Sequence, residues 1–195
     1  MNNMKSKTLP YAVLFCGILT VSTAALFIRY LQERNFPSLS IAALRLTFAA
    51  LLLTIPVYSK YRQEIKLLNR NHILIAAGAG FFLAVHFGAW ISSMDYTSVT
   101  SSAALVSTTP IWAAIFAIVI LKEKISKFAV IGILLTLAGS TFIFLSDKSQ
   151  TSQNYTQPIL GNSLAVLGAL AMCFYLIIGK KLANSINLWV YVWIV

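Results

Sequence analysis

Six apolar stretches, each long enough to cross a lipid bilayer, constrain this sequence more than any other feature. A hydrocarbon core of about 30 Å takes roughly 20 helical residues to cross. The stretches are continuously apolar rather than alternating, so they predict helices and not the strands of a membrane β-barrel. They lie near residues 9–28, 39–58, 73–92, 98–121, 128–146 and 161–179.

The composition supports the same fold class. Hydrophobic residues make up 58% of the 195 residues, charged residues make up 10%, and the mean hydropathy is +0.80, outside the usual range of soluble domains. A further apolar run, residues 182–195, is too short for a full crossing and indicates either an interfacial helix or a fragment. We therefore predict an all-α integral membrane protein, a polytopic bundle of about six to seven transmembrane helices.

The basic residues predict the orientation of the chain. If the N-terminus is cytoplasmic, the inner segments contain Lys5, Lys7, Lys60, Arg62, Lys66, Arg70, Lys122, Lys124, Lys127, Lys180 and Lys181. The outer loops contain only Arg34 and Lys148, with Arg29 at a helix end. This positive-inside asymmetry predicts a cytoplasmic tail at 1–8 and insertion in the cytoplasmic (plasma) membrane. Because orientation accounts for the net charge of +10, we do not expect nucleic acid as a partner.

The residue types needed for metal binding or hydrolysis do not occur together. Cys16 and Cys173 both lie mid-helix with no second ligand at metal spacing, so we expect no metal site and no cofactor. Serine hydrolase and metalloprotease motifs are missing from the sequence, so we expect no enzyme. The acids all lie in loops or at helix ends, at Glu33, Glu64, Asp95, Glu123 and Asp147.

The fourth apolar stretch has one polar face. Helical spacing places Ser101, Thr108, Thr109 and Trp112 on one side. Pro110 cannot donate to the carbonyl of the residue four positions earlier, which leaves an acceptor near mid-membrane that lipid cannot satisfy. The hydroxyl face is typical of either a solute path or hydrogen bonding to a neighbouring helix. The proline favours the path.

The third stretch separates small residues from aromatic ones. Four small residues at intervals of four form a ridge that predicts close helix packing, at Ala76, Gly80, Ala84 and Gly88. Phe82, His86 and Trp90 lie roughly opposite this ridge. Trp90 is near the outer boundary, where an aromatic-belt anchor is the usual role. His86 lies deeper, where an ionisable group more often has a function.

Arg45 is the one formally charged residue inside a predicted span. An arginine there either faces the bundle or reaches back to the interface along its aliphatic stem. We expect it to face the bundle, at a depth similar to that of His86. In the predicted site, Arg45 and His86 contact an anionic or polar group of a solute. The other path residues are Ser101, Thr108 and Thr109 as hydrogen-bonding groups, Pro110, and Trp90 and Trp112 as apolar walls.

A polar segment at 147–160 follows the first five spans and predicts an outer loop. A second copy beginning after five spans would enter the membrane in the opposite orientation. Shifting the first span by 151 positions pairs Gly17 with Gly168 and Arg29 with Lys180. We predict a first five-helix repeat at 9–146 and an incomplete, inverted second repeat at 161–195.

Three segments resemble the EamA-type repeat of the drug/metabolite transporter superfamily. They are "LSIAALRLTFAALLL", "MDYTSVTSSAALVSTTPIWAAIFAIVILKEKIS" and "IGILLTLAGSTFIFL". The resemblance implies ten helices in two inverted repeats around a central substrate path, and export of amino acids or other small metabolites. It also implies that Arg45, Tyr96, Pro110 and Glu123 occupy recurring positions. Glu123, flanked by lysines, is interpreted as a structural residue at a helix end.

Two functions follow from these observations. The first is a permease that moves a small polar or amphipathic solute by alternating access. The second is a non-transporting membrane scaffold or a truncated or split-gene remnant subunit that needs another chain. The expected partners are the small-molecule solute and the lipid bilayer, with a homo-oligomer or a second half-transporter chain as a further candidate.

Overall fold

The computed structural model describes residues 5–120, 122–146, 155, 157–183 and 185–195, and every regular element in these ranges is helical. Most of the predicted outer loop at 147–160, and residues 1–4 of the predicted tail, lie outside them. Six segments are long and apolar enough to cross a membrane: 9–32, 38–60, 70–96, 99–119, 127–146 and 158–182. They coincide with the six predicted stretches, which confirms the all-α polytopic membrane fold.

The chain forms two compact units, and the first is Met1–Pro37. It consists of helix α1 (Lys5–Gln32) and the turn that ends it. Asn35 adopts a left-handed φ of 60°, and the Phe36 N–H donates to the Leu31 carbonyl over 3.1 Å. Asparagine is one of the few residues that tolerate this conformation, so it suits a helix end where the chain must turn.

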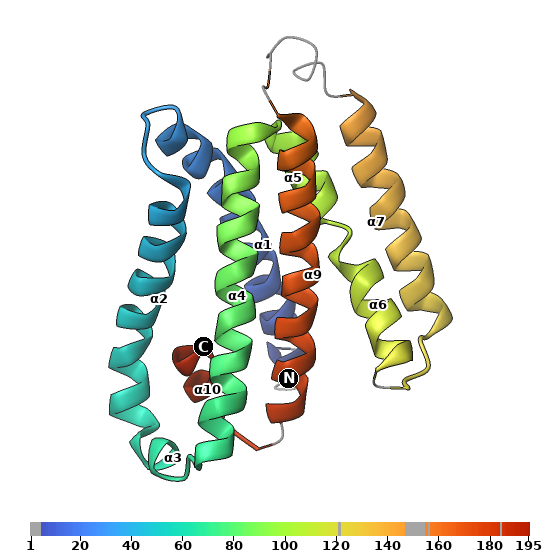
Figure 1. Cartoon of the computed structure of the whole chain (residues 1–195). Helices are drawn as coiled ribbons and strands as arrows, with labels where there is room; N and C mark the ends of the chain where they lie inside the picture. The colour runs from blue at the N-terminus through green and yellow to red at the C-terminus, as the bar shows by residue number, and fades with distance from the viewer. Residues whose placement is uncertain (1–4, 121, 147–154, 156, 184) are drawn as a thin grey trace. The chain divides into compact units, whose positions relative to one another are not determined.

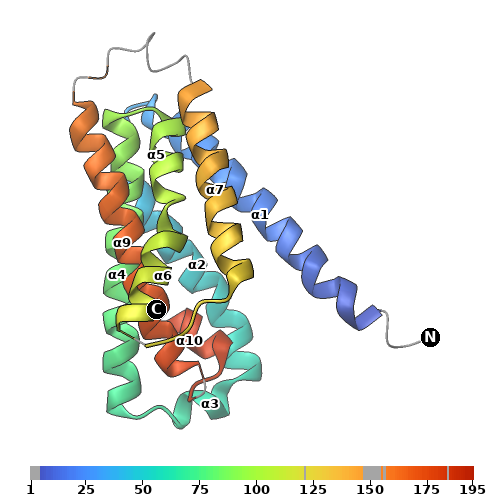
Figure 2. The ribbon, with the colours of Figure 1, turned by 90° about the vertical axis from the view of Figure 1, so that its right-hand side faces the viewer.

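The second unit, Ser38–Val195, contains all the other helices (Figure 1). Its elements are α2 (Ser38–Lys60), α3 (Arg62–Lys66), α4 (Arg70–Tyr96), α5 (Val99–Val106), α6 (Thr109–Val119), α7 (Lys127–Ser146), α9 (Pro158–Leu182) and α10 (Leu188–Ile194). The long helices run up and down beside one another, and α4 and α9 form the central pair (Figures 1 and 2). Helix α2 packs on α4, and α5 and α6 pack on α9.

The α4–α9 pair is close because α9 presents small residues to α4. Gly161, Ala165 and Gly168 lie one turn apart or slightly less along α9, and Ala165 is completely buried. A Cβ at Gly161 would lie 2.9 Å from the Ser93 carbonyl oxygen, and one at Gly168 would lie 3.3 Å from the His86 carbonyl oxygen. Small residues at such an interface allow backbones to approach within membranes, where dispersion drives packing.

Helix α10 packs against α2 and α4, and aromatic side chains join it to α2. The Trp193 indole N–H donates to the Thr54 hydroxyl over 2.9 Å, and the Trp193 ring meets Tyr58 edge-on at 5.5 Å between centroids. Trp189 stacks on Tyr61 at 6.3 Å. The short apolar run predicted near the C-terminus is therefore a helix anchored to the bundle by polar and aromatic contacts.

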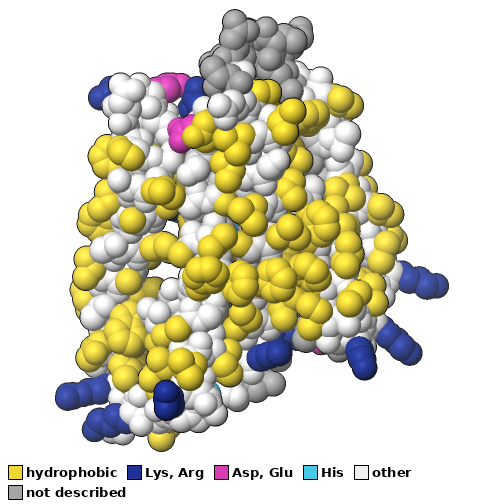
Figure 3. Space-filling model, in the orientation of Figure 1, with side chains coloured by type: hydrophobic (Ala, Val, Ile, Leu, Met, Phe, Trp, Pro, Cys, Tyr) yellow, Lys and Arg dark blue, Asp and Glu magenta, His cyan; other side chains and the backbone are white. Residues whose placement is uncertain are grey.

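The surface of the second unit is largely apolar at mid-height and basic at one end (Figure 3). Large exposed hydrophobic residues occur on every long helix, including Phe128, Phe142 and Leu145 of α7. Such an area is unfavourable in water and suited to lipid. At the basic end, Lys60, Arg62, Lys66 and Arg70 lie around the connection of α2 to α4, Lys122, Lys124 and Lys127 lie around the connection of α6 to α7, and Lys180 and Lys181 lie in the last turn of α9.

Candidate functional site

The fourth predicted span is interrupted between α5 and α6, immediately before Pro110. The Thr109 hydroxyl donates to the Val106 carbonyl over 2.6 Å, and the Thr108 hydroxyl donates to the Leu105 carbonyl over 2.6 Å. Val106 is the residue whose carbonyl loses its backbone donor because of the proline. The acceptor that the sequence left unsatisfied is therefore bonded by a side chain one turn further along.

The same threonines connect the break to neighbouring side chains. The Trp112 indole N–H donates to the Thr108 hydroxyl oxygen over 3.1 Å. The Cys173 thiol, from α9, donates to the Thr109 carbonyl over 3.3 Å. Both threonine hydroxyls thus stabilise the break, and their protons are committed to backbone oxygens.

The serines of the predicted polar face are buried where α4 meets α5. Ser101 is 2% exposed, and its backbone N–H donates to the Ser98 hydroxyl oxygen over 3.0 Å, which caps the start of α5. Ser102 is completely buried, with its hydroxyl 2.5 Å from that of Ser93 in α4. At this end of the face, the hydroxyls of Ser98 and Ser102 bond to groups of α5 and α4.

Arg45 of α2 lies against the aromatic side chains of α4. Its guanidinium carbon is 4.9 Å from the centroid of the Phe87 ring and 5.9 Å from that of Trp90. Arg45 is seven residues into α2, and Trp90 is six residues before the end of α4, so both are about 10 Å below the helix ends. The guanidinium therefore lies over the rings of α4 instead of reaching back to the interface.

His86 links α4 to α9. This residue is 7% exposed, and its Nδ1 lies 2.9 Å from the Gly168 carbonyl oxygen. A carbonyl only accepts, so Nδ1 carries the proton and only Nε2 remains for another partner. The imidazole stacks on Trp90 at 6.0 Å between centroids. Arg45, His86, Phe87 and Trp90 form one cluster, which we call the arginine cluster.

The arginine cluster contains two hydrogen-bond donors without acceptors. Nη1 of Arg45 and Nε1 of Trp90 are both buried and make no hydrogen bond to any of the described residues. Each buried donor left unpaired costs about 1–3 kcal/mol. Both belong to side chains of the arginine cluster, at the α2–α4 interface.

The predicted path residues occupy two groups rather than one. The arginine cluster lies between α2, α4 and α9, whereas Thr108, Thr109, Pro110 and Trp112 lie at the break beside α9. Phe174 of α9 contacts both α4 and α6, with its ring 4.9 Å from Phe82 and 5.1 Å from Phe116 between centroids.

The small-residue ridge of α4 has different surroundings along its length. Ala76 is completely buried, and a Cβ at Gly80 would lie 3.0 Å from the Val195 carbonyl oxygen. Gly88 lies beside Leu39 of α2, where a Cβ would have an ordinary 3.5 Å contact. Ala84, between them, is exposed. The lower part of the ridge thus meets the C-terminal segment, and the upper part meets α2.

Glu123 forms an ion pair at the basic end. Both of its carboxylate oxygens lie 2.6 Å from Lys180 Nζ of α9. Lys122 adopts a left-handed φ of 54°, and the Glu123 N–H donates to the Ala117 carbonyl, so the chain turns sharply after α6. This turn brings the carboxylate to α9.

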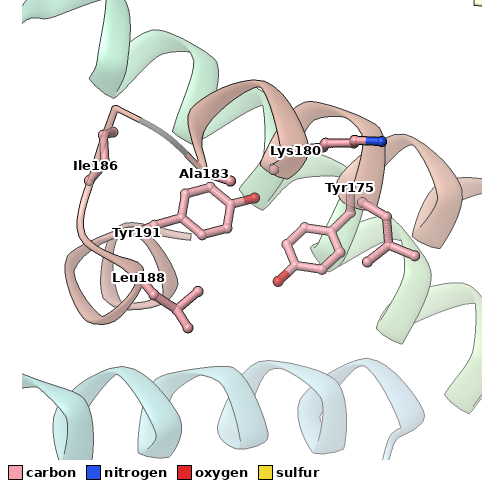
Figure 4. A pocket seen from close by; sticks show the side chains of 8 residues that line it. Tyr175, Lys180, Ala183, Ile186, Leu188 and Tyr191 are labelled. Carbon is pink, nitrogen blue, oxygen red and sulfur yellow. The ribbon is translucent and has the colours of Figure 1, made fainter. Parts of the chain in front are cut away.

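A cavity of about 400 Å³ lies between α9 and α10 at the basic end (Figure 4). Tyr175 and Tyr191 stack at 6.4 Å between ring centroids on its wall, and a Cβ at Gly179 would lie 2.7 Å from the Tyr191 hydroxyl. Among the described residues that line this cavity, Lys180 is the charged one, and none is a predicted path residue.

Sequence reasoning missed Phe87, Gly168, Ser93 and Lys180 as partners of the predicted residues. The sequence did point to Gly168, because its pairing with Gly17 was one of the two that supported the internal repeat. Nothing in the sequence pointed to Phe87 or Ser93, since an aromatic or serine residue in an apolar helix is common. Among the described residues, no group of three or more His, Cys, Asp or Glu residues could hold a metal ion.

The chain is similar to known transporters. The family model of EamA-like transporters matches residues 8–145. Solute carrier family 35 member G1 of Homo sapiens is 26% identical over 186 residues, which cover 88% of this chain and 48% of that protein. Its Mus musculus counterpart is 30% identical over 104 residues, 50% of this chain and 28% of that protein. An uncharacterized transporter of Bacillus subtilis, YetK, is 34% identical over 95 residues, 48% of this chain and 28% of that protein.

The matches cover less than half of the length of each of these relatives. No solved structure matches the chain. The family match nevertheless covers well over half of the 195 residues and includes the first five spans. With six apolar helices in its described residues and a family match over 8–145, this integral membrane protein belongs to the EamA-like transporter family, whose members are transporters and not enzymes.

Proposed function

We propose that this protein is a secondary carrier that moves a small metabolite, such as an amino acid or a related polar solute, across the cytoplasmic membrane by alternating access. The observation that carries the proposal is Arg45, a charged residue about 10 Å inside its span whose guanidinium contacts another helix. An intramembrane charge is costly and is normally retained for a function.

The orientation and the repeat support this mechanism. Placing the basic end in the cytoplasm satisfies the positive-inside rule and makes the N-terminus cytoplasmic. We infer that residues 9–146 are one repeat and that 161–195 begin an inverted one. Helix α9, the first of the second repeat, packs against α4, α5 and α6. Carriers of this design bind solute where the two repeats meet, and Gly168 of α9 holds His86 there.

The proposed path residues fall into two roles. Arg45, His86 and Trp90 contact the solute in the arginine cluster. Ser101, Thr108, Thr109, Pro110 and Trp112 form a broken helix beside α9, the kind of irregularity that transporters tolerate next to a path. A broken helix needs less rearrangement to bend than a continuous one, so the break is a candidate hinge for alternating access.

The test is solute movement in proteoliposomes that contain the purified chain. A panel of labelled amino acids and small organic acids is loaded inside, and efflux is measured for wild type and for Arg45→Ala. We expect efflux of at least one solute, reduced about tenfold or more in the variant. Arg62→Ala is the matched control, because it removes the same charge from an exposed position of α3.

The scaffold alternative gives a different result. A non-transporting scaffold moves no solute, and Arg45→Ala then changes only its stability or assembly. Wild-type protein that is folded by circular dichroism, reconstituted in either orientation, and inactive toward the whole panel would contradict the carrier proposal.

A further inference from the structure

The arginine cluster is built around positive charge that no carboxylate of the described residues neutralises. Glu33 pairs with Arg29, Glu123 pairs with Lys180, and Asp95 accepts a hydrogen bond from Ser38. Glu64 lies in α3, at the basic end. Arg45 lies about 10 Å from the opposite end of its helix and has no ion pair among the described residues.

The aromatic rings stabilise the charge of the guanidinium but do not accept hydrogen bonds from all of its N–H groups. Phe87 and Trp90 present ring faces at 4.9 and 5.9 Å, which stabilises a cation by about 0.5–2 kcal/mol. A ring face accepts little from an in-plane N–H group. Nη1 of Arg45 therefore remains a buried donor without an oxygen acceptor among the described residues. Nε1 of Trp90 is a second such donor, on the ring whose centroid lies 5.9 Å from the guanidinium carbon.

The two unpaired donors specify the missing group. A guanidinium presents a planar pair of N–H groups that fits the two oxygens of a carboxylate, and an indole N–H adds a third donor from a rigid ring. His86 contributes no competing donor in its neutral form, because its Nδ1 proton is held by Gly168. The cluster thus offers donors, aromatic walls and one positive charge.

We infer that the arginine cluster binds the carboxylate of a small organic anion, through the Arg45 guanidinium and the Trp90 indole N–H. This inference rests on the proposed carrier function and gives its solute a chemical class. Both donors are enclosed in this structure. The anion therefore reaches them when neighbouring side chains move apart, as alternating access requires.

The roles of the two residues differ. Arg45 provides the charge, and its substitution removes binding of every anion. Trp90 provides one directed hydrogen bond and a wall, so Trp90→Phe keeps the wall and removes only the N–H. In the free protein this N–H is unpaired, so its loss should leave stability unchanged or raise it. In the bound protein, loss of this N–H should lower the affinity for the carboxylate about tenfold.

The experiment measures binding and transport with the same purified protein in phosphatidylcholine nanodiscs and vesicles. The probes are propionate, lactate and succinate, each compared with its amide, and inorganic phosphate. Binding is read from the shift in unfolding temperature, and transport from efflux. We expect wild type to be stabilised by at least one carboxylate and not by its amide, with binding about tenfold weaker in Trp90→Phe and lost in Arg45→Met.

Trp193→Phe is the matched control, since the Trp193 indole N–H already donates to Thr54. It should lower stability and leave carboxylate affinity unchanged. Equal loss of affinity in Trp193→Phe and Trp90→Phe would overturn the inference. So would stabilisation by phosphate as strong as that by carboxylates, by the amides, or by acidic lipid added to the nanodiscs in place of solute.

The two proposals fail separately. If the amides are transported as well as the acids and Arg45→Met still abolishes movement, the carrier function stands and the carboxylate inference is wrong. If carboxylates bind as expected but no probe crosses the membrane, the binding inference stands and the carrier function is wrong.

Discussion

The Thr109 hydroxyl bonds to the carbonyl of Val106, the backbone group that Pro110 leaves without its usual donor. The 2.6 Å contact lies within the membrane-spanning part of the chain, between α5 and α6. A hydroxyl one residue before a proline can therefore compensate for the hydrogen bond that the proline removes. Two adjacent features of the sequence, a polar residue and a helix breaker, are explained together.

Thr109→Val tests this compensation. The variant leaves the Val106 carbonyl without a donor, and we expect the free energy of unfolding to fall by about 1–3 kcal/mol. In a Pro110→Ala background, residue 110 has an N–H that can bond to the same carbonyl, so Thr109→Val should cost much less. The measurement is a double-mutant cycle by SDS titration in mixed micelles, with an expected coupling of about 1 kcal/mol or more.

Thr136→Val is the control for this cycle. Its hydroxyl donates to the Gly132 carbonyl over 2.9 Å, but in an unbroken part of α7 where the carbonyl keeps its backbone donor. It should change stability by only a few tenths of a kcal/mol. Additive effects of Thr109→Val and Pro110→Ala would show that the threonine does not serve the proline.

Gly161→Ala should separate α4 from α9. A Cβ at this position would lie 2.9 Å from the Ser93 carbonyl oxygen and 2.9 Å from the Thr97 backbone nitrogen, and neither backbone can retreat cheaply. We expect a loss of about 1–3 kcal/mol, because overpacking forces backbone shifts. The measurement is thermal unfolding of the purified protein in detergent.

The matched variant is Gly139→Ala in α7, where a Cβ meets no atom within 4 Å. There, alanine improves helix propensity, and we expect stability to stay equal or rise by up to about 1 kcal/mol. Equal destabilisation by both alanines would mean that the close contact at Gly161 does not limit packing.

The sequence predicted the spans well because their signal is local. A run of about 20 apolar residues needs no information about its neighbours, and all six predicted stretches are helical segments of sufficient length. The interruption before Pro110 was also foreseeable, since the missing N–H is a property of the residue itself. Both predictions depend on what a residue is, not on what it touches.

The partners could not be predicted, because they depend on which helix faces lie together. The ridge from Ala76 to Gly88 was predicted to be a close-packing face of α4. The close contact of Gly161 of α9 with Ser93 and Thr97, on another part of α4, was not predicted. Helical spacing also placed Ser101 and Thr109 on one polar face, but the two residues bond to different partners, Ser98 and Val106. Periodicity gives the angle of a side chain, not its neighbour.

His86→Asn should separate the structural part of His86 from any contact with solute. The asparagine amide nitrogen occupies roughly the place of Nδ1 and can still donate to the Gly168 carbonyl, whereas nothing replaces Nε2. We expect His86→Asn to retain most of the stability and His86→Leu to lose about 1–3 kcal/mol. If the carrier proposal is right, both variants lose transport. Equal stability of the two variants would contradict the structural role of the Gly168 contact.

The basic end should face the cytoplasm. The test uses Lys66→Cys and Gln157→Cys. Lys66 lies at the end of α3, and Gln157 lies at the start of α9, at the opposite end of the second unit. In a background where Cys16 and Cys173 are alanine, a membrane-impermeant maleimide should label intact cells at 157 only. Labelling at 66 in intact cells and not at 157 would reverse the orientation.

The ion pair between Glu123 and Lys180 should contribute little to stability on its own. Its side chains are 44% and 57% exposed, and exposed pairs are usually worth about 0–1 kcal/mol. We expect Glu123→Gln and Lys180→Met each to lower the free energy of unfolding by less than about 1 kcal/mol in low salt, and by less still in high salt.

The swapped variant, Glu123→Lys with Lys180→Glu, distinguishes an attraction between the two side chains from a requirement for each charge in its own place. If attraction is what matters, the swapped protein should recover the stability lost by Glu123→Lys alone. If the swapped protein does not recover this stability, a negative charge is needed at position 123 itself. There, Lys122 and Lys124 flank it and the turn after α6 fixes its position. Efflux measured on the same variants shows whether the contact between α9 and this turn also limits movement. A normal rate in the swapped protein and a changed rate in each single variant would mean that it does.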